Sequence, residues 1–516
     1  MSGDRKNRIS QFVVTAQQMR DIEGRIFAAG MPVAALMEKV AGLITHRIKE
    51  IFPPINSSIG ILVGPGHNGG DALVVARELY FCGANVWLYC PFNKLKELTS
   101  QHLQYVQSLG IPCYQDFQEL PDCNYLIDGL FGFGLEREIQ QPIAQAIDYF
   151  NHWQKPIISI DIPSGLHTDT GSVLGIAIRA DYTLCLGLWK LGLLQDQALD
   201  YLGKVELIDF GIPLADIEFV LGKAPQIQRI TRKFALSILP LPRPLVTHKY
   251  QQGHLLLICG SRRYAGGAIL TGLGARGSGV GMLSIAIPES LKPLLVAQLP
   301  EALIIGCPET ATGAIAELPS DLNLHQYQAI ACGPGLTTEP VNIVQQVLAV
   351  NTPLVLDADA LNIVAQLGTI PTLEKRPSPT VITPHTGEFA RLFPHIPGIQ
   401  EAAKVSGAVV LLKGARTAIA ASAEHSSIAH PGGKIWINPE STPALARGGS
   451  GDVLTGLLGG LLAQLVSQGK PLEDIVATAA WWHAQAGILA AQKRTELGVD
   501  AYNLTQFILP VLNANC

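Results

Sequence analysis

The stretch Ala446-Arg447-Gly448-Gly449-Ser450-Gly451-Asp452 leads directly into the uncharged, apolar run 453–462. Glycines just before a helical pattern leave backbone N–H groups free at the start of the helix, where the helix dipole also favours negative charge. The stretch therefore predicts a phosphate-binding turn with Asp452 at its mouth. A carboxylate there can take a proton from a hydroxyl group that attacks a phosphoryl group. The alternative is that Asp452 caps the helix and the glycines only form a tight turn.

The bulk composition sets limits on what surrounds this turn. A chain of 516 residues is too long for one ordinary core and predicts two or three domains. A hydrophobic content of 48% with 15% charged residues indicates a compact globular protein. A formal charge of −5 without a basic cluster argues against a nucleic-acid or anionic-membrane binder. Phosphate recognition is therefore expected to be local.

Cysteine usage and terminal composition indicate the compartment. The nine cysteines are odd in number and have no C-x-x-C spacing, which favours reduced thiols over disulfides or a zinc site. No apolar segment follows the charged residues 1–8, so we expect no signal peptide. The uncharged run 453–469 contains Gly, Gln, Ser and Thr, which predicts a buried helix and not a membrane span. We therefore expect a cytoplasmic protein.

The first half of the chain begins with helical periodicity over 16–49, broken near Gly30-Met31-Pro32. A short apolar run of buried-strand type, 59–63, then leads into Gly64-Pro65-Gly66-His67-Asn68-Gly69-Gly70-Asp71 and a helical run over 72–81. Strand, glycine turn and helix are the layout of a nucleotide-binding crevice in a doubly wound sheet. The turn is neither a Walker A loop nor the GxGxxG of a dinucleotide fold.

Two later strand ends in this half carry carboxylates. Asp128 opens Asp128-Gly129-Leu130-Phe131-Gly132-Phe133-Gly134-Leu135, and Asp161 opens Asp161-Ile162-Pro163-Ser164-Gly165. If the strands are parallel, both ends meet the 64–71 turn in one crevice. A single strand-end Asp is more often a turn former, so that alternative stays open for each. The further strands expected in this half are 86–90, 125–127, 157–160, 183–186 and 205–208.

A change in composition marks the domain boundary. Residues 214–247 contain Pro225 and then Leu239-Pro240-Leu241-Pro242-Arg243-Pro244, which is too proline-rich for a helix or a central strand. We expect a first domain over 1–222, a linker over 223–246 and a second domain over 247–516.

The second half repeats the pattern of strands that end in polar or glycine-rich turns. These turns include Gly333-Pro334-Gly335-Leu336, Asp357-Ala358-Asp359, Pro384-His385-Thr386-Gly387-Glu388 and Lys413-Gly414-Ala415-Arg416-Thr417. A second α/β crevice is therefore expected, and the chain looks like two enzymes. The strands expected are 255–259, 282–287, 328–332, 353–356, 381–383 and 409–412.

These turns suggest phosphoryl transfer. If a terminal phosphate rests on 448–451, the turn at 413–417 offers cations and backbone donors for the remaining phosphate. Asp452 could then deprotonate a hydroxyl held by His385 and the Gly335 turn. The product either keeps its phosphate or loses it by elimination. His385 can equally be a core or capping histidine, and Lys413 an exposed cation.

Several motifs in order resemble a known family. The second half resembles the ribokinase-like, ADP-dependent NAD(P)H-hydrate dehydratase. The first half resembles NAD(P)H-hydrate epimerase, and the order of the two resembles the bifunctional bacterial NAD(P)H-hydrate repair enzymes. The motifs that carry the resemblance are Met37-Glu38 with Ala41-Gly42, the 64–71, 128–135 and 161–165 turns, Thr383-Pro384-His385-Thr386-Gly387-Glu388, Leu412-Lys413-Gly414, Asn438-Pro439 with Ala444-Leu445-Ala446, and 448–456.

The resemblance implies a Rossmann-like three-layer α/β/α first domain and a ribokinase-like α/β second domain. It implies that the second domain phosphorylates the 6-hydroxyl of S-hydrated NADH or NADPH from ADP, with Mg²⁺, and then eliminates phosphate, with AMP as by-product. Asp452 would be the base, and Gly267, Gly335 and His385 would line the hydrate site. The implied ADP-binding residues are Lys413, Gly414, Ala415, Arg416, Thr417, Gly448, Gly449, Ser450 and Gly451.

For the first domain, the resemblance implies interconversion of the R and S hydrates by reversible departure of the hydroxyl. That route needs a carboxylic acid that gives and retakes a proton, and we choose Asp161. It also implies K⁺ held by the oxygens of Asn68, Asp128 and Ser164. Many relatives have Asn at the position of His67, a tolerated difference. The implied contacts to the hydrate are His67, Asn68, Gly69, Gly70, Asp71, Gly132, Phe133, Gly134, Leu135, Glu136, Arg137, Glu138 and Asp161.

Two alternatives remain beside this interpretation. One is a ribokinase-like small-molecule kinase with an N-terminal nucleotide-binding regulatory domain, in which Asp452 has the same role. The other is a binding protein that only captures nucleotides, which the loss of Asp128 or Asp161 would have favoured. We further expect a homo-oligomer.

Overall fold

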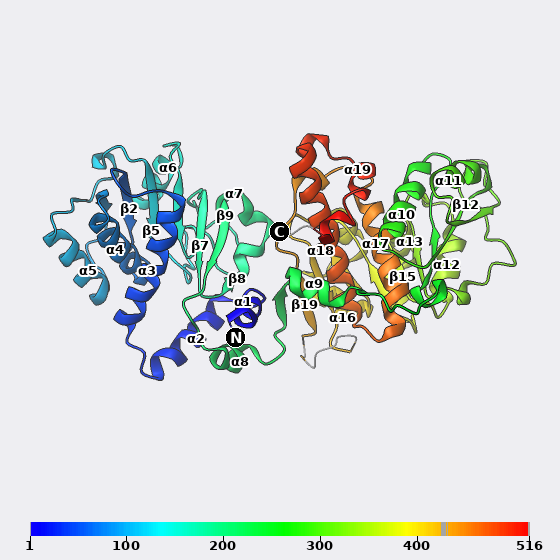
Figure 1. The fold of residues 1–516 in the computed structure, drawn as a ribbon, viewed down its shortest axis with the longest axis horizontal. Coiled ribbons are helices and arrows are strands. Elements are labelled where there is room, and N and C mark those ends of the chain that lie inside the picture. Colours follow the sequence, from blue (N-terminus) through cyan, green and yellow to red (C-terminus); the bar gives the residue numbers. More distant parts are fainter. Residues whose placement is uncertain (1, 425–429, 431, 514–516) are drawn as a thin grey trace. The chain divides into compact units, whose positions relative to one another are not determined.

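The computed structural model describes residues 2–424, 430 and 432–513. It divides into two compact units, Met1–Lys223 and Ala224–Cys516. Each unit has its own central sheet and its own hydrophobic cores (Figure 1). The fold class expected from the sequence, two α/β units with helices around a central sheet, is confirmed.

The sheet of the first unit has seven strands, all parallel, in the order β4-β3-β2-β5-β6-β7-β9. The chain runs outward from β2 to β4 and then returns to the other side of β2 with β5. The switch point between β2 and β5 is where ligands bind in such sheets. The strands are β2 (Ser58–Val63), β3 (Asn85–Tyr89), β4 (Cys113–Tyr114), β5 (Tyr125–Gly129), β6 (Ile157–Ile160), β7 (Tyr182–Leu186) and β9 (Lys204–Ile208), and a separate parallel pair joins β1 (Val13–Val14) to β8 (Trp189–Lys190).

Helices cover both faces of this sheet and make the three layers. On one face the alternate strand residues Ile59, Ile61 and Val63 pack in a core with several helices, and on the other face Leu62 and Leu126 pack chiefly with α6. Both side-chain sets are apolar because both faces of a parallel sheet are covered. The helices are α1 (Ser2–Ile9), α2 (Ala16–Ala28), α3 (Val33–Ile51), α4 (His67–Phe81), α5 (Glu97–Ser108), α6 (Ile143–Asn151), α7 (Leu199–Leu202) and α8 (Leu214–Leu221).

Helix α4 begins earlier than the sequence pattern indicates. The apolar periodicity starts at residue 72, but Gly66 is the N-cap and His67 and Asn68 already lie in the first helical turn. Gly69 is needed there because a Cβ would lie 2.0 Å from the Gly64 carbonyl oxygen. The polar residues of the glycine turn are therefore fixed by a helix and not by a loop.

The sheet of the second unit is larger and mixed, in the order β10-β19-β18-β17-β16-β15-β14-β11-β12-β13. Strand β18 pairs antiparallel with both of its neighbours, and the remaining pairs are parallel. The switch point lies between β11 and β14. The strands are β10 (Ile227–Arg229), β11 (His254–Ile258), β12 (Met282–Pro288), β13 (Leu303–Cys307), β14 (Ala329–Cys332), β15 (Leu354–Leu356), β16 (Thr380–Ile382), β17 (Val409–Leu412), β18 (Ala418–Ala421) and β19 (Lys434–Ile437).

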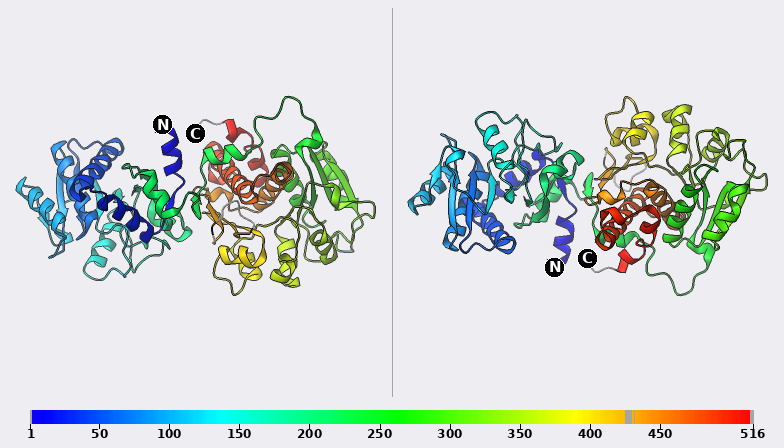
Figure 2. Two further views of the ribbon diagram at one scale, coloured as in Figure 1. Left: turned by 90° about the horizontal axis from the view of Figure 1, so that it is seen from below. Right: turned by 90° about the horizontal axis from the view of Figure 1, so that it is seen from above.

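Two helical layers enclose this sheet, and Figure 2 shows them on its opposite faces. One core joins α9, α10, α11 and α17–α20 to one face, and the other joins α12, α13, α15 and α16 to the opposite face. The helices are α9 (Arg232–Ile238), α10 (Ala265–Gly277), α11 (Lys292–Gln298), α12 (Val341–Ala349), α13 (Asp359–Leu367), α14 (Thr369–Leu373), α15 (Thr386–Leu392), α16 (Ile399–Ser406), α17 (Ser450–Leu465), α18 (Leu472–Arg494), α19 (Ala501–Thr505) and α20 (Pro510–Asn513).

The segment 214–247 contains regular structure that the proline content argues against. Helix α8 ends before Pro225, and β10 and α9 lie between Pro225 and Pro240, so the prolines stand outside these elements. Strand β10 is an edge strand of the second sheet, and Ile230 and Ile238 are buried in the second unit's core. The expectation that this segment forms no helix is therefore wrong, and much of the expected linker 223–246 belongs to the second unit.

The apolar helix after Asp452 is a core helix. Within the described residues, 450–468 is the stretch whose length and composition would suit a membrane span, and 78% of its window is buried inside the protein. Its apolar side chains pack against α10, α18 and the sheet. The expected buried helix is confirmed as far as Leu465, and residues 467–469 are exposed.

Candidate active sites

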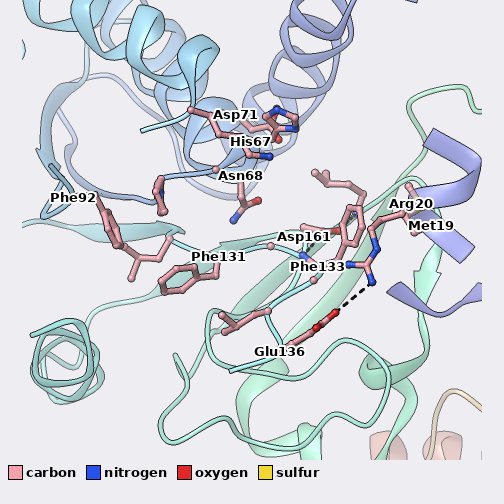
Figure 3. A pocket seen from close by; sticks show the side chains of 18 of the residues that line it. Met19, Arg20, His67, Asn68, Asp71, Phe92, Phe131, Phe133, Glu136 and Asp161 are labelled. Atoms are coloured by element: carbon pink, nitrogen blue, oxygen red, sulfur yellow. Dashed lines mark hydrogen bonds and ion pairs between the residues drawn. The ribbon is translucent and has the colours of Figure 1, made fainter. Parts of the chain in front are cut away.

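The first unit holds a cavity of about 1320 Å³ at the switch point between β2 and β5, which we call the first cavity. Its walls come from α2 and α3, from the first turn of α4, and from the loop that follows β5. Figure 3 shows His67, Asn68 and Asp71 along one wall and Phe131 and Phe133 on another. This volume suits a large ligand, and the phenylalanine rings of the wall can pack against an aromatic group.

Asp161 lies in this cavity as part of a buried ion pair. Its side chain pairs with the ammonium of Lys190, which is fully buried. The carboxylate also accepts hydrogen bonds from the backbone N–H groups of Leu186, at 3.2 Å, and Phe133, at 3.1 Å. Asp161 itself has a φ of 71°, a conformation that costs a non-glycine residue on the order of 1 kcal/mol. These contacts hold the Asp161 carboxylate in a fixed position.

Two further carboxyl groups line the cavity near Asp161. Burial raises the pKa of Glu23, on α2, to about 7, with a further rise from Asp161 and an opposing effect of Lys190. Burial also raises the pKa of Asp71 well above its usual range, and Asp161 and Glu23 add to the rise. For Lys190, burial lowers the pKa, but Asp161 and the other nearby anions reverse this, and the net direction is upward.

Asp128 and Ser164 lie together at the base of this site. Asp128 is fully buried and accepts hydrogen bonds from Ser164 Oγ at 2.6 Å, Ser164 N at 2.9 Å, Ser159 Oγ at 2.8 Å and Leu130 N at 3.2 Å. Burial raises the pKa of Asp128, and these hydrogen bonds work against the rise. The turn-forming bond to Leu130 is thus one contact among several. Nearby, Asn68 Nδ2 is buried and has no hydrogen-bond partner among the described residues.

The structure brings most of the expected hydrate contacts together. Gly69 and Gly70 are the exceptions: both are buried in α4, where a Cβ on Gly70 would lie 2.6 Å from the Met37 side chain. They serve helix packing, and the expected hydrate contacts through them are not found in the cavity lining. The residues that do line it are His67, Asn68, Asp71, Gly132, Phe133, Gly134, Leu135, Glu136, Arg137, Glu138 and Asp161.

A second cavity, of about 530 Å³, lies in the second unit over the start of α17. Gly448, Gly449 and Asp452 form part of its lining, with Gly267 and Gly335 across from them. A Cβ on Gly267 would lie 3.4 Å from Asp452 Oδ2, so the Gly267 backbone lies directly beside the carboxylate. Gly449 is the N-cap of α17, and no side chain caps this helix. Asp452 therefore does not cap the helix.

Asp452 is poised to titrate near neutral pH. Burial raises its pKa to about 7, Asp357 and Asp359 raise it too, and Lys413 opposes them. A carboxyl with this pKa is half-ionised near neutrality and can accept a proton from a hydroxyl.

Lys413 belongs to a network below the glycine turn. Its Nζ lies 2.7 Å from Asp357 Oδ1, and Thr455 Oγ1 donates to Asp357 Oδ2 at 2.6 Å. A Cβ on Gly451 would lie 3.5 Å from Lys413 Nζ, so the amine reaches the start of α17. Burial lowers the pKa of Lys413, but Asp357 and the other anions around it outweigh this, and the net direction is upward. Lys413 is therefore a partly buried cation that Asp357 holds in place, and not an exposed one.

His385 is a helix cap. Its Nδ1 accepts hydrogen bonds from the backbone N–H groups of Gly387, at 3.0 Å, and Glu388, at 3.4 Å, at the start of α15. It does not line the second cavity, although its strand end is bridged to Lys413. Of the four expected hydrate residues, the cavity brings together Gly267, Gly335 and Asp452. The capping role that the sequence left open is the one the geometry shows.

Some of the expected ADP-binding residues line the second cavity and the others do not. Gly448 and Gly449 line the cavity, whereas Ser450 is buried and its carbonyl accepts a hydrogen bond from His483 Nε2 at 3.0 Å. The turn at 413–417 follows β17 and is not part of the cavity lining.

Sequence reasoning missed several residues of both sites. Lys190 is a single lysine in the apolar run 184–194, which is a usable signal of a buried partner. Glu23 gives no such signal, because it belongs to an ordinary amphipathic helix. In the second unit, Tyr264 and Asp359 line the cavity. Asp359 belongs to the expected turn at 357–359, but the sequence pattern gave this residue no role.

Two family profiles match the chain. The profile described as NAD(P)H-hydrate dehydratase matches residues 255–510. The profile described as YjeF-related protein N-terminus matches residues 33–192. The first of these stretches contains the second cavity, and the second contains most of the first cavity.

Similar proteins extend over nearly the whole chain. The bifunctional NAD(P)H-hydrate repair enzyme Nnr of Synechocystis sp. is 53% identical over 505 residues, covering 96% of this chain and 94% of that protein. The enzyme of the same name from Thermosynechococcus vestitus is 51% identical over 516 residues, covering 97% of each. A crystal structure described as the ADP/ATP-dependent NAD(P)H-hydrate dehydratase from Bacillus subtilis co-crystallised with ATP/Mg²⁺ is 32% identical, with a TM-score of 0.45, and covers 55% of this chain and 96% of that one.

Proposed function

The chain belongs to the bifunctional NAD(P)H-hydrate repair enzymes, and we propose that its two cavities divide the repair between them. The enzyme combines an NAD(P)H-hydrate epimerase with an ADP/ATP-dependent NAD(P)H-hydrate dehydratase. The first cavity is the epimerase site and the second is the dehydratase site. The observation that carries this assignment is Asp452, a carboxyl with a pKa of about 7 beside an open glycine turn.

In the second cavity, Asp452 takes the proton of the 6-hydroxyl of the S hydrate. The hydroxyl oxygen then attacks the terminal phosphorus of ADP, and the bond to the bridging oxygen breaks to release AMP. The backbone N–H groups at the start of α17, with Lys413 behind them, stabilise the charge on the phosphoryl group as it moves. Loss of phosphate from C6 and of a proton from C5 restores NADH or NADPH.

Mg²⁺ would enter this site with the nucleotide. No group of three or more His, Cys, Asp or Glu side chains converges on a metal position among the described residues. The carboxylate of Asp359 lines the cavity, and one carboxylate together with substrate phosphates is a usual Mg²⁺ environment. Bound there, the ion would neutralise phosphate charge.

In the first cavity, the hydroxyl leaves C6 with the help of the ring nitrogen, and water returns to either face. Asp161 would take a proton from that water or return one to the departing hydroxyl. Its rigid placement by Lys190 and two backbone N–H groups suits a group that must approach C6 closely.

K⁺ would be held by Asn68, Asp128 and Ser164. The donor set fits a hard monovalent cation because it offers carboxamide, carboxylate and hydroxyl oxygens with a single formal charge. The buried carboxamide of Asn68 has no partner for its Nδ2, so turning the amide would present an oxygen ligand instead. Bound there, K⁺ would order the wall of the cavity. Epimerisation should be faster in K⁺ than in Li⁺, and equal rates would contradict this site.

The test uses the full chain and its Asp452→Asn variant, each given an R/S mixture of NADPH hydrate with ADP. NADPH absorbance follows dehydration, and separation of the epimers follows interconversion. We expect the variant to lose NADPH formation by about 10³-fold or more and to keep interconversion within about twofold. The matched control is Asp321→Asn, an exposed aspartate of the same unit. Loss of both activities in the variant, or a wild-type chain that forms no NADPH, would contradict the assignment.

We propose that this repair takes place in the cytoplasm. That the chain forms a homo-oligomer stays a prediction. The cysteines at 82, 90, 113, 123, 185, 259, 307 and 332 are all free, which supports a reducing compartment.

A further inference from the structure

Epimerisation needs a proton donor as well as a proton acceptor. The departing hydroxyl must be protonated to leave as water, and the water that returns must lose a proton. Asp161 is placed to act on one side of the ring, because Lys190 and two backbone N–H groups hold its carboxylate at the cavity wall. One carboxyl group on one wall cannot both protonate a hydroxyl that leaves from one face of the ring and take a proton from water that adds to the other face. A second group must then supply the first proton.

Glu23 is the cavity residue that fits this need. It lies on α2, which is a different element from the β6 strand end that carries Asp161, and both residues line the first cavity. Glu23 is half-buried and has no hydrogen-bond or ion-pair partner among the described residues. A carboxyl group that is largely removed from solvent is normally paired, so one that lines a cavity without a structural partner is free to act on a ligand. Nothing in the packing of α2 uses this carboxyl group.

We propose that Glu23 is the second acid–base residue of the epimerase, working with Asp161 across the nicotinamide ring of the bound hydrate. This inference rests on the proposed epimerase site. Protonated Glu23 gives its proton to the 6-hydroxyl, the C6–O bond breaks, and the ring nitrogen supplies the electron pair, which leaves water and an iminium cation. A solvent water then adds to C6 from the opposite face, the nitrogen regains its electron pair, and Asp161 takes the proton of that water. The reverse direction exchanges the two roles.

The electrostatics of the cavity agree with this division. Burial raises the pKa of Glu23 to about 7, so that the proton is present at neutral pH and is lost above it. The charged groups that face Glu23 are Lys190 and Asp161 across the cavity and Asp71 on α4. Two carboxyl groups in different surroundings, one held in an ion pair and one without a partner among the described residues, can divide the roles of acid and base. Both directions use the single proton that this pair shares, so its loss above a pH of about 7 should lower the rate in both directions.

The experiment measures epimer interconversion by the full-length Glu23→Gln variant, with kcat and KM determined separately in each direction. We expect kcat to fall by about 10²-fold or more with KM changed less than threefold, because general acid–base catalysis is worth this much. In the wild type, kcat should fall as the pH rises above about 7. In the variant, kcat should not show this fall. When the wild type interconverts the epimers in ¹⁸O-labelled water, the hydroxyl group on C6 should acquire ¹⁸O.

Three comparisons make the result decisive. Asp21→Asn, an exposed aspartate on the same helix, should leave interconversion unchanged. Glu23→Asp should retain more activity than Glu23→Gln, because it keeps a carboxyl group. If Glu23→Gln retains the wild-type kcat while Asp71→Asn loses it, the donor is Asp71 and the proposal is overturned. If the wild type itself does not interconvert the epimers, it is the proposed epimerase site that fails. Retention of the C6 oxygen would overturn the water-exchange route.

Discussion

Asp452 shows how a single residue acquires its chemistry from its surroundings. In water its carboxyl would be ionised at neutral pH and a weak base. At the third position of α17 it is instead shielded by the cavity wall and lies near Asp357 and Asp359. The resulting pKa of about 7 makes it a stronger base, and its ionised form is still present at neutral pH.

This pKa predicts the pH dependence of dehydration. The base must be ionised, so the rate with saturating ADP and S hydrate should rise with pH through about 7 and then level off. The measurement is kcat for NADPH formation over roughly three pH units centred on that value. ADP affinity measured at the same pH values separates titration of the nucleotide from that of the enzyme. A flat kcat profile would contradict Asp452 as the titrating base.

The same shift has a consequence for stability that needs no substrate. Because folding raises the pKa of Asp452 from 3.8 to about 7, the folded state favours the protonated form. Stability from this group is therefore fully present below the unfolded pKa and is lost as pH rises through the folded one. Asp452→Asn should melt at a higher temperature than the wild type above that pH, and at the same temperature in acid.

At the scale of elements, the second site depends on the close approach of α10 and α17. The two helices touch through small residues: a Cβ on Gly456 would lie 1.8 Å from the Thr271 carbonyl oxygen, and one on Gly274 would lie 2.2 Å from that of Val453. This approach places Gly267, near the start of α10, beside Asp452, near the start of α17. The glycines of the helix interior therefore shape the cavity at its end.

Gly456→Ala should therefore destabilise the second unit. The added methyl group cannot fit unless the helices separate, which costs roughly 1–3 kcal/mol or more. The matched control is Gly266→Ala on α10, where an added Cβ meets nothing within 4 Å. That variant should be as stable as the wild type or slightly more stable, because alanine favours helix. Thermal unfolding of both variants checks this, and equal melting temperatures would contradict the packing argument.

At the scale of the whole molecule, the chain consists of two units that each bury their own cores. The second unit begins well before the strand that carries its first glycine turn. Strand β10 pairs with β19 at the edge of the sheet, and the Phe234 ring of α9 packs against the Trp436 ring with the centroids 4.1 Å apart. Residues 224–246 therefore contribute to the fold of the dehydratase.

Two truncated fragments can show where the second unit begins. A fragment of residues 224–516 should fold cooperatively and dehydrate the S hydrate with ADP. A fragment of residues 247–516 should melt at a much lower temperature or aggregate, because each large apolar side chain lost from the core costs about 2 kcal/mol. The residues removed from that core are Ile230, Ala235, Ile238 and Leu239. Equal melting temperatures for the two fragments would show that β10 and α9 are dispensable.

The sequence by itself determined the architecture and the position of both glycine turns. Apolar runs and glycines act locally, so the main parallel strands, the break near Pro32 and the buried helix after Asp452 could be predicted. The short or edge strands β10, β13, β18 and β19 could not, because they are stabilised by pairing with distant neighbours and not by their own pattern.

Only the tertiary structure decided which charges meet. Lys190 follows β7 closely along the chain and reaches Asp161 at the end of the neighbouring β6. Lys413 at the end of β17 reaches Asp357 at the end of β15, because β16 alone separates these two strands in the sheet. The raised pKa of Glu23 follows from its burial in the cavity beside Lys190 and Asp161, and not from any feature of its own helix. Likewise, the structure places His385 as the cap of α15 and outside the lining of the second cavity. Electrostatic environment depends on distance through space, and the sequence alone does not contain that distance.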